Sequence, residues 1–354
     1  MHILILADTV DNQKAGIHFY TKNLISALLK IDKENSYTFI HSRPNDFFKN
    51  TNHYIIPQKR GFGSETIRRF IKIPKLIKSL HPDIVLEPCH IGPFRLPKSI
   101  RKAVVIHDLT PILFPKFHIR RSVIIHKLFL KKTLKNADLI ITPSQSTAND
   151  IRKFCKISSK ITPIHLGISP PIANPPLSSI KKPYILFLGT IEPRKNLKML
   201  IDAFSELKAE HNIPHRLVLA GEIGWKSGEI LKKTHLRKDI ILTGYVTEEE
   251  KAALYAGTDM FVYPSIYEGF GLPPLEAMSY GIPVICSTGG SLKEIFSDHA
   301  LTFSPADKDS LKAHILSLIN NPHLKTQLSD SGKTYASTFT RRKAAAETLK
   351  ALTS

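Results

Sequence analysis

Residues 263–284 read Tyr263-Pro-Ser-Ile-Tyr-Glu-Gly-Phe-Gly-Leu-Pro-Pro-Leu-Glu-Ala-Met-Ser-Tyr-Gly-Ile-Pro-Val284 and decide the fold class of the chain. The apolar run Asp259-Met-Phe-Val-Tyr263 leads into this stretch and predicts a buried parallel strand. Gly269 and Gly271 follow in a loop, where glycine allows positive φ and close approach of a ligand to the backbone. A buried strand that ends in a glycine loop indicates a ligand site at the edge of a parallel sheet.

A short helix is expected after this loop. Pro274 suits its first position, Gly281 suits its C-terminal end, and Pro283 prevents its continuation. Backbone NH groups near residues 270–276 then lack partners within the helix and form an anion site of the kind that holds a phosphate or diphosphate. Because Glu276 is itself an anion, we expect it to contact a different part of the same ligand.

Glu268 and Glu276 form an E-x7-E pair of carboxylates. Retaining glycosidases hold two carboxyl groups roughly 5 Å apart, whereas eight helical residues rise about 12 Å, and the glycines put Glu268 in the loop. We therefore expect Glu276 to bind a ribose and Glu268 to bind a second hydroxyl-rich group, which makes the ligand a nucleotide sugar. The alternative is that both glutamates are solvated residues of a loop and a helix, unrelated to the Gly and Pro pattern around them.

The stretch resembles the corresponding region of the retaining glycosyltransferases of family 4, which have the two-domain GT-B fold. Two departures from the family pattern are Thr190, where many members have Arg, and Ala15, where a Gly-Gly pair is usual. The other segments that look like family motifs are the phosphate-binding turn Gly189-Thr-Ile-Glu-Pro-Arg-Lys-Asn-Leu197, the base-side loop Thr243-Gly-Tyr-Val246, the later helix start Gly290-Ser-Leu-Lys-Glu-Ile295, and two acceptor-domain loops, Ala15-Gly-Ile-His-Phe-Tyr20 and His107-Asp-Leu-Thr-Pro111.

This resemblance implies roles for individual residues. Glu276 would bind the ribose and Glu268 the donor sugar. Arg194 and Lys195 would bind the diphosphate, and His107 would lie in the region of the donor sugar and the acceptor. We expect His107, Glu268, Arg194 and Lys195 to act in catalysis. The remaining implied donor-binding residues are Gly16, Gly189, Tyr245, Gly269, Phe270, Gly271 and Leu272.

The length of 354 residues predicts two domains. A proline-rich stretch without apolar periodicity is the predicted linker, so we expect an acceptor-binding Rossmann-like domain over 1–168, a linker over 169–183, a nucleotide-sugar-binding domain over 184–335, and a C-terminal helix over 336–354 that packs back on the first domain. Short apolar strands alternate with helical patterns, which predicts an α/β protein with two doubly wound parallel sheets facing each other across a cleft. The resemblance to family 4 implies that this arrangement is the GT-B fold. The expected strands are Ile3–Ala7, Ile84–Leu86, Val104–Ile106, Leu139–Thr142, Tyr184–Leu188, Leu217–Ala220, Ile240–Thr243, Phe261–Tyr263 and Val284–Cys286.

The positive charge is concentrated in the first half of the chain. Residues 1–180 have 28 Lys/Arg against 11 Asp/Glu, whereas residues 181–354 have 22 against 19. Two basic regions interleaved with apolar residues suit the surface of an anionic membrane. A merely solvated basic surface is the main alternative, and nucleic acid is disfavoured because no nucleic-acid-binding module is recognisable. The regions are Lys59, Arg60, Arg68, Arg69, Lys72, Lys75 and Lys78, and Lys116, Arg120, Arg121, Lys127, Lys131, Lys132 and Lys135.

Three scattered cysteines, no signal peptide and no apolar run of ~20 residues predict a cytoplasmic protein whose membrane contact, if present, is peripheral. No metal site and no cofactor are expected. Asp307-Lys-Asp309 has the D-x-D form of metal-dependent glycosyltransferases, but it precedes a helical pattern and is better explained as an N-cap. Gly221-Glu-Ile-Gly-Trp-Lys-Ser227 lacks the glycine spacing of a phosphate-binding P-loop.

The phosphate turn and the E-x7-E segment, together with the resemblance to the retaining family 4 enzymes, predict a retaining, metal-independent glycosyltransferase that moves a hexose from a nucleotide diphosphate to a glycan or lipid-linked acceptor. The Glu-Pro-Arg-Lys-Asn sequence of the phosphate turn resembles mannosyltransferases of bacterial surface-polysaccharide assembly, which makes GDP-mannose the expected donor. Two alternatives remain, a nucleotide-sugar epimerase of the same fold and a non-catalytic basic adaptor at a membrane.

Overall fold

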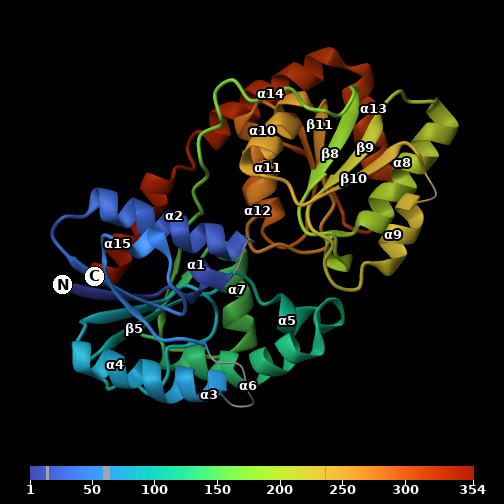
Figure 1. Ribbon diagram of the computed structural model, residues 1–354. Coiled ribbons are helices and arrows are strands. Elements are labelled where there is room, and N and C mark those ends of the chain that lie inside the picture. Colours follow the sequence, from blue (N-terminus) through green and yellow to red (C-terminus); the bar gives the residue numbers. More distant parts are fainter. Residues whose placement is uncertain (13–15, 59–63, 236) are drawn as a thin grey trace. The chain divides into compact units, whose positions relative to one another are not determined.

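The computed structural model describes residues 1–12, 16–58, 64–235 and 237–354 (Figure 1). Expectations for Ala15, Lys59 and Arg60 fall outside these residues. The chain divides into two compact units: one comprises Met1–Leu113, Arg120–Gly167 and Arg341–Ser354, and the other comprises Phe114–Ile119 and Ile168–Thr340. Residues 169–183 contain no helix or strand.

The first unit contains, within the described residues, a seven-stranded sheet with the order β3-β2-β1-β4-β5-β6-β7, and neighbouring strands are parallel. Its strands are β1 (His2–Leu6), β2 (Ser36–His41), β3 (Asn52–Ile55), β4 (Ile84–Glu87), β5 (Arg101–Val105), β6 (Leu139–Thr142) and β7 (Lys160–Pro163). Its helices are α1 (Asp8–Asn12), α2 (Gly16–Ile31), η1 (Asp46–Phe48), α3 (Ser64–Ile67), the π-helix η2 (Arg68–Lys72), α4 (Ile73–Leu80), α5 (Thr110–Leu113), α6 (Arg120–Asn136), α7 (Gln145–Phe154) and α15 (Arg341–Thr353).

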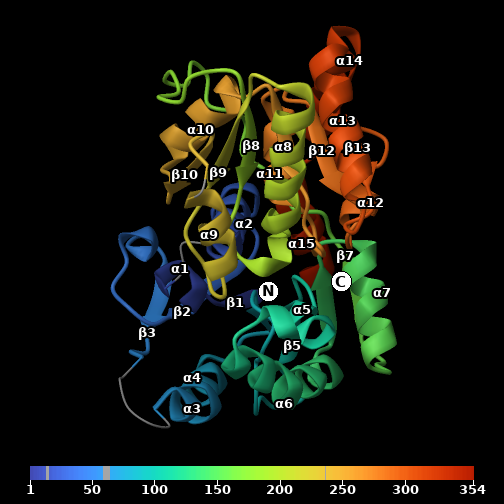
Figure 2. The ribbon, with the colours of Figure 1, turned by 90° about the vertical axis from the view of Figure 1, so that its right-hand side faces the viewer.

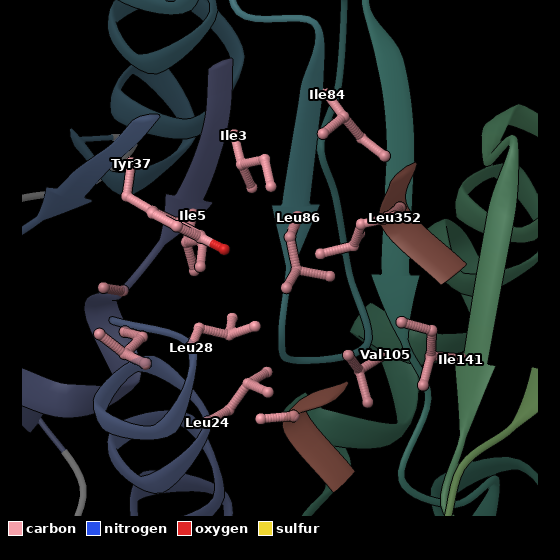
Figure 3. Close-up of a cluster of buried hydrophobic side chains, with 14 of the residues drawn as sticks. Ile3, Ile5, Leu24, Leu28, Tyr37, Ile84, Leu86, Val105, Ile141 and Leu352 are labelled. Atoms are coloured by element: carbon pink, nitrogen blue, oxygen red, sulfur yellow. The ribbon is translucent and has the colours of Figure 1, made fainter. Parts of the chain in front are cut away.

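The alternation of side chains along β1 explains how this sheet is covered on both faces. Ile3 and Ile5 pack with residues of α2 and α15, including Leu28 and Leu352 (Figure 3). Leu4 and Leu6 point to the opposite face and pack with α4. On that same side of the sheet, β5 and β6 contribute to a cluster with α6 and α7. The C-terminal helix α15 therefore completes the core of the first unit.

The second unit contains a six-stranded parallel sheet in its described part, with the order β10-β9-β8-β11-β12-β13 (Figure 2). Its strands are β8 (Tyr184–Leu188), β9 (Arg216–Ala220), β10 (Ile240–Gly244), β11 (Met260–Tyr263), β12 (Val284–Ser287) and β13 (Leu301–Phe303). Its helices are η3 (Pro115–Phe117), η4 (Pro193–Lys195), α8 (Leu197–His211), α9 (Gly228–His235), α10 (Glu248–Gly257), α11 (Leu272–Ser279), α12 (Leu292–Phe296), α13 (Lys308–Asn320) and α14 (Pro322–Ala336). Two doubly wound parallel sheets are thus confirmed.

The strand order of both sheets reverses once. In the first sheet the reversal lies between β1 and β4, and in the second it lies between β8 and β11. Ligands of doubly wound sheets bind beyond the carboxyl ends of the strands at such a switch point. The loops that follow β8 and β11 therefore define where a candidate site in the second unit is to be sought.

Candidate functional site

The loops after β8 and β11 meet at the switch point of the second sheet. The first loop contains the turn from Gly189 to Leu197, and the second contains Glu268. β8 and β11 are neighbours in the sheet although β9 and β10 lie between them in sequence. This topology brings Arg194 and Lys195, at the end of the short helix η4, to the same place as Glu268.

Glycine is required where the loop after β8 passes the loop after β9. Gly189 has φ 152° and Gly221 has φ 138°. A Cβ added at Gly221 would lie 2.1 Å from the carbonyl oxygen of Gly189, so no side chain fits there. The close packing of these two loops places Gly189 beside the lysine of the turn, since a Cβ at Gly189 would lie 3.8 Å from Cε of Lys195.

Glu268 is the centre of a buried ionic cluster. Lys195 Nζ donates to Glu268 Oε1 at 2.6 Å, and Arg194 Nη1 lies 2.9 Å from Oε2 of the same carboxylate. Arg194 also donates to Glu192 Oε1 at 2.7 Å, and Lys195 donates to the Tyr263 hydroxyl at 2.7 Å. The proposed sugar-binding carboxylate is therefore in direct contact with both of the proposed diphosphate-binding cations.

Burial and charge act against each other on the ionisable groups of this cluster. Burial favours the neutral form of Glu268, but the charges of Arg194 and Lys195 outweigh it and lower its pKa to about 2. Burial also lowers the pKa of Lys195, which the ion pair with Glu268 opposes. The pKa of Glu192 is raised, mainly by burial, against the charge of Arg194. Glu268 is thus the ionised partner that keeps both cations in place.

The backbone at Glu268 is fixed by two glycines and a serine. Glu268 N donates to Gly289 O at 3.3 Å, and Ser291 N donates back to Glu268 O at 2.9 Å. A Cβ at Gly290, which has φ 65°, would lie 2.3 Å from Glu268 O. The motif Gly290–Ile295 therefore positions the loop of Glu268.

Glu276 has a different set of partners. It lies on α11, where its carboxylate accepts from the Tyr255 hydroxyl at 3.1 Å and from Lys251 Nζ at 3.4 Å, both on α10. Burial raises the pKa of Glu276, although Lys251 opposes the effect. The two carboxylates of the E-x7-E pair thus contact different sets of residues, as their spacing predicts.

The start of α11 corrects one expectation. The helix begins at Leu272 and not near Pro274, because Gly271 takes a left-handed conformation (φ 105°) and acts as its N-cap. Pro273 and Pro274 follow within the first turn and carry no NH. The NH groups of Gly271 and Leu272 are consequently the donors that the start of this helix can direct to an anion. The C-terminal end at Gly281 is confirmed, with φ 71° at that residue.

The remaining residues of the second unit that are expected to contact the donor differ in their exposure. Phe270 is 4 % exposed and packs on Phe339 with ring centroids 6.1 Å apart, so a ligand would meet the backbone here and not the ring. Gly269 directly precedes it in the same loop. Tyr245 is 52 % exposed and follows the edge strand β10, which β9 and β8 separate from β11. Its loop can contact only the end of a ligand that extends along the sheet edge.

The residues expected in the first unit also gather at strand ends. His107 follows β5, and its Nε2 donates to Pro88 O at 2.9 Å, which places the proton of the neutral ring on Nε2. Burial lowers the pKa of His107. Tyr20 meets the His107 ring edge-on at 4.8 Å. Gly16 is the first residue of α2, the helix that carries Tyr20.

A second charged cluster lies at the switch point of the first sheet. Arg68 forms a bidentate pair with Asp8, with both hydrogen bonds at 2.6 Å. Glu87 ends β4 and is 8 % exposed. A cavity lies between these strand ends and η2–α4, and its lining includes Asp8, Arg69, Glu87 and Gly92. The first unit thus has, at the corresponding place in its fold, a pocket whose mainly apolar lining includes the charged residues Asp8, Arg69 and Glu87.

Comparison with known proteins identifies the family. Residues 172–335 match the family described as Glycosyl transferases group 1, and residues 15–170 match Glycosyltransferase Family 4. The O-antigen chain mannosyltransferase B of Escherichia coli is 34 % identical over 276 residues, which cover 73 % of this chain and 72 % of that protein. The chain belongs to the family 4 glycosyltransferases.

Other relatives of this glycosyltransferase are also similar to it in sequence or in structure. The serotype-specific mannosyltransferase WbdA of Escherichia coli is 33 % identical over 229 residues, although the match spans only 28 % of its length. Sucrose-phosphate synthase from Thermosynechococcus elongatus has a TM-score of 0.75 and 18 % identity, covering 99 % of this chain and 98 % of that chain. A complex of the Anabaena protein HepE with UDP-glucose has a TM-score of 0.73 and 16 % identity, covering 99 % and 100 %. These structures show that the glycosyltransferase has the GT-B fold.

Several residues of the candidate site were not predicted from the sequence. Glu192 and Tyr263 hold Arg194 and Lys195, and Tyr255 and Lys251 hold Glu276. His90 lies 5.4 Å from His107 between ring centroids, and burial lowers its pKa to about 3. The only signal for Glu192 and Tyr263 is their place in the turn and at the end of β11, next to the residues that they contact.

The structure supplies no candidate metal centre in the parts that it describes, since no group of three or more His, Cys, Asp or Glu side chains is arranged to hold an ion there. Asp307 is the N-cap of α13, as expected, and its Oδ1 accepts from Ser310 N at 2.9 Å. Among the described helices, none has both the length and the apolar character needed to cross a membrane.

Proposed function

We propose that this glycosyltransferase moves mannose from GDP-mannose, with retention of configuration and without a metal ion, to a glycan or lipid-linked acceptor in the synthesis of a bacterial surface polysaccharide. The relatives named as O-antigen and serotype-specific mannosyltransferases support the sugar and the pathway. The Anabaena neighbour in complex with UDP-glucose supports a nucleotide sugar as the class of donor.

The observation that carries this proposal is the contact of Arg194 and Lys195 with one carboxylate at the switch point. In the transfer, the bond between C1 of the sugar and the diphosphate oxygen breaks, and its electron pair leaves with the diphosphate. The two cations and the NH groups of Gly271 and Leu272 would stabilise the charge that grows there. The acceptor hydroxyl forms the new bond to C1 on the same face, and its proton passes to the departing phosphate.

Glu268 would hold a hydroxyl of the donor sugar while it fixes the two cations. Because its pKa is about 2, it is ionised at neutral pH and can accept this hydrogen bond. Glu276 would accept hydrogen bonds from the ribose, in place of or in addition to that from Tyr255. The proton of His107 is engaged with Pro88 O, so Nδ1 would accept a hydrogen bond from a sugar hydroxyl.

Thermal unfolding in the presence of individual nucleotide sugars tests the donor. We expect GDP-mannose and GDP to raise the melting temperature, because a ligand at about 100 times its Kd stabilises the native state by about 2.7 kcal/mol. Stabilisation by UDP-sugars alone would contradict the assignment of the nucleotide. Release of an epimerised nucleotide sugar without transfer would favour an epimerase, and no response to any nucleotide would favour a non-catalytic adaptor.

The acceptor and its location are further parts of the proposal. A lipid-linked acceptor at the inner face of the cytoplasmic membrane would explain the excess of positive charge in residues 1–180. The protein would then act in the cytoplasm, with the acceptor held by the first unit and the donor held by the second.

A further inference from the structure

Two helical segments of the first unit expose apolar and basic side chains together. One is the continuous segment α3–η2–α4, in which Ile67 is 49 % exposed and Ile71 is 53 % exposed. The other is α6, in which Ile124 is 55 % exposed and Leu128 is 66 % exposed. Covering large aliphatic side chains that are so exposed on helices removes them from water, which is favourable.

The two segments are neighbours, held together by aromatic side chains. Phe70 of η2 stacks on Phe94 with ring centroids 4.6 Å apart, and Phe129 of α6 lies 5.5 Å from Phe70 and 5.8 Å from Phe94. Both views show α3, α4 and α6 side by side at one end of the first unit (Figures 1 and 2). Ile71 directly follows Phe70 and Leu128 directly precedes Phe129, so the exposed apolar residues flank the cluster on both segments.

The charges around these apolar side chains are of one sign. α6 contains no acidic residue, and the single acid of the other segment, Glu65, is paired with Arg69 at 2.7 Å. Arg68 does not belong to this surface, contrary to the expected basic region, because it is 2 % exposed and paired with Asp8. The exposed basic side chains are Lys72, Lys75 and Lys78 on one segment and Arg120, Arg121, Lys127, Lys131, Lys132 and Lys135 on the other.

We propose that α3–η2–α4 and α6 form one membrane-docking face that inserts Ile67, Ile71, Ile124 and Leu128 between the lipids of an anionic bilayer. Charge complementarity selects this partner, since basic side chains attract anionic headgroups while aliphatic side chains between them enter the acyl boundary. A solvated basic surface would not need four exposed aliphatic residues. The inference rests on the proposed lipid-linked acceptor, to which such a face would bring the first unit.

Sedimentation with vesicles of phosphatidylcholine, alone or mixed with phosphatidylglycerol, tests the proposal on the full chain. We expect binding to the mixed vesicles that weakens with added salt. Lys131→Gln with Lys132→Gln should lower the partition coefficient about 25-fold, since each basic residue near the surface contributes about fivefold. Ile124→Ser with Leu128→Ser should lower it about tenfold or more with no change in charge.

Matched controls lie in the second unit. Lys232→Gln with Lys238→Gln removes two exposed lysines, and Leu177→Ser removes a side chain that is 98 % exposed. Both control variants should bind vesicles as the original chain does. In Leu128→Trp, indole fluorescence should shift to shorter wavelength with mixed vesicles by more than that of Trp225 in the original chain, and this difference reports insertion.

Equal binding to both kinds of vesicle, no binding to either, or unchanged binding of the Ile124→Ser, Leu128→Ser variant would overturn the proposal. Binding of duplex DNA that depends on Lys131 and Lys132 but not on the aliphatic residues would assign the face to nucleic acid instead. The response of melting temperature to GDP-mannose should be the same in every variant. If a variant loses vesicle binding but keeps its response to GDP-mannose, the result bears on the docking face and not on the donor. If the original chain binds vesicles but does not respond to GDP-mannose, the donor proposal fails and the docking proposal stands.

Discussion

Glu268 has two tasks in the proposed mechanism, because it accepts from the donor sugar and keeps Arg194 and Lys195 together. Replacement by Gln removes its charge and keeps its shape. We expect Glu268→Gln to abolish transfer and to lower the free energy of unfolding by up to about 3–5 kcal/mol, the range for losing one partner of a buried ion pair. Binding of GDP should be retained or strengthened, because both cations lose their internal counter-charge.

Calorimetric titration with GDP and a transfer assay measure these two effects separately. Glu229→Gln is the control, since the Glu229 side chain is 75 % exposed and its pair with Lys198 lies on the surface. It should leave both stability and activity unchanged, because an exposed ion pair contributes little. Full turnover by Glu268→Gln would remove this residue from the site.

Glu87 should make stability depend on pH. Burial raises its pKa to about 8, although Arg69 opposes the effect. The unfolded chain releases this proton near pH 4.3 while the native protein keeps it, so the native state binds more protons between about pH 4.3 and pH 8. The free energy of unfolding should therefore fall with rising pH across that window, by roughly 1.4 kcal/mol per unit, and level off above it.

Glu87→Gln should flatten this slope, because the amide cannot titrate and its oxygen can still accept from Cys89 N. Urea unfolding of both proteins at about pH 5 and about pH 9 gives the comparison. The variant should gain stability relative to the original chain as pH rises. If the free energies of unfolding of the two proteins differ by the same amount at both pH values, Glu87 is ionised in the folded protein.

The position of single residues could be predicted where a motif directly follows a strand, whereas their roles in binding and transfer stay predictions. Arg194, Lys195 and Glu268 stand at fixed distances after apolar strands, and the topology then brings them together. The partners Glu192 and Tyr263 could not be predicted, because their roles depend on side-chain directions within the turn and at the end of β11. Whether an expected donor-binding residue such as Phe270 offers its side chain or only its backbone to a ligand also depends on packing that the sequence does not state.

Among the strands, the buried central ones were predicted and several others were not. Leu139–Thr142 and Tyr184–Leu188 match β6 and β8 to the residue, because an unbroken apolar run marks a strand buried on both faces. β3 and β7 were missed since they are edge strands with half-exposed or exposed side chains, and β13 has only three residues. β2 was also missed, although it is buried, because it includes Ser36, Thr38 and His41.

The loop between β12 and α12 should be intolerant of a side chain at Gly290. Gly290→Ala would put Cβ 2.3 Å from Glu268 O and would also strain the backbone at φ 65°. We expect a loss of about 1–3 kcal/mol of stability from the backbone alone. Transfer should be reduced further, because the displaced carbonyl moves the Glu268 side chain. Circular dichroism melting and the transfer assay provide the measurements.

Gly228→Ala is the matched control for this loop. Gly228 begins α9, and a Cβ there would meet nothing within 4 Å. Its stability and activity should stay close to those of the original chain. Equal behaviour of the two alanine variants would contradict the close approach between Gly290 and Glu268.

On the scale of the whole molecule, the first unit depends on the end of the chain. α15 contributes Leu352, which is fully buried, to the core of the first sheet, and Arg101 donates to the Leu352 carbonyl at 3.0 Å. We expect Leu352→Ala to cost about 2–5 kcal/mol of stability in the first unit. GDP binding should be unchanged, because the candidate donor residues of the second unit make no part of this core.

Urea unfolding and titration with GDP decide the point, with Lys350→Ala as an exposed control on the same helix. A Leu352→Ala protein that unfolds like the control would mean that α15 is dispensable for the first unit. Loss of GDP binding in the folded Leu352→Ala protein would contradict the assignment of the nucleotide to the second unit.

The proposed function is one reaction with a defined stereochemical outcome. The most direct test is nuclear magnetic resonance of the full chain turning over GDP-mannose, in which mannose is α-linked, with a lipid-linked glycan acceptor and a chelator present. We predict that the first product signal is that of an α-mannoside and that it grows as GDP is released. A β-mannoside, a requirement for divalent metal, or release of GDP with free mannose alone would contradict a retaining, metal-independent mannosyl transfer.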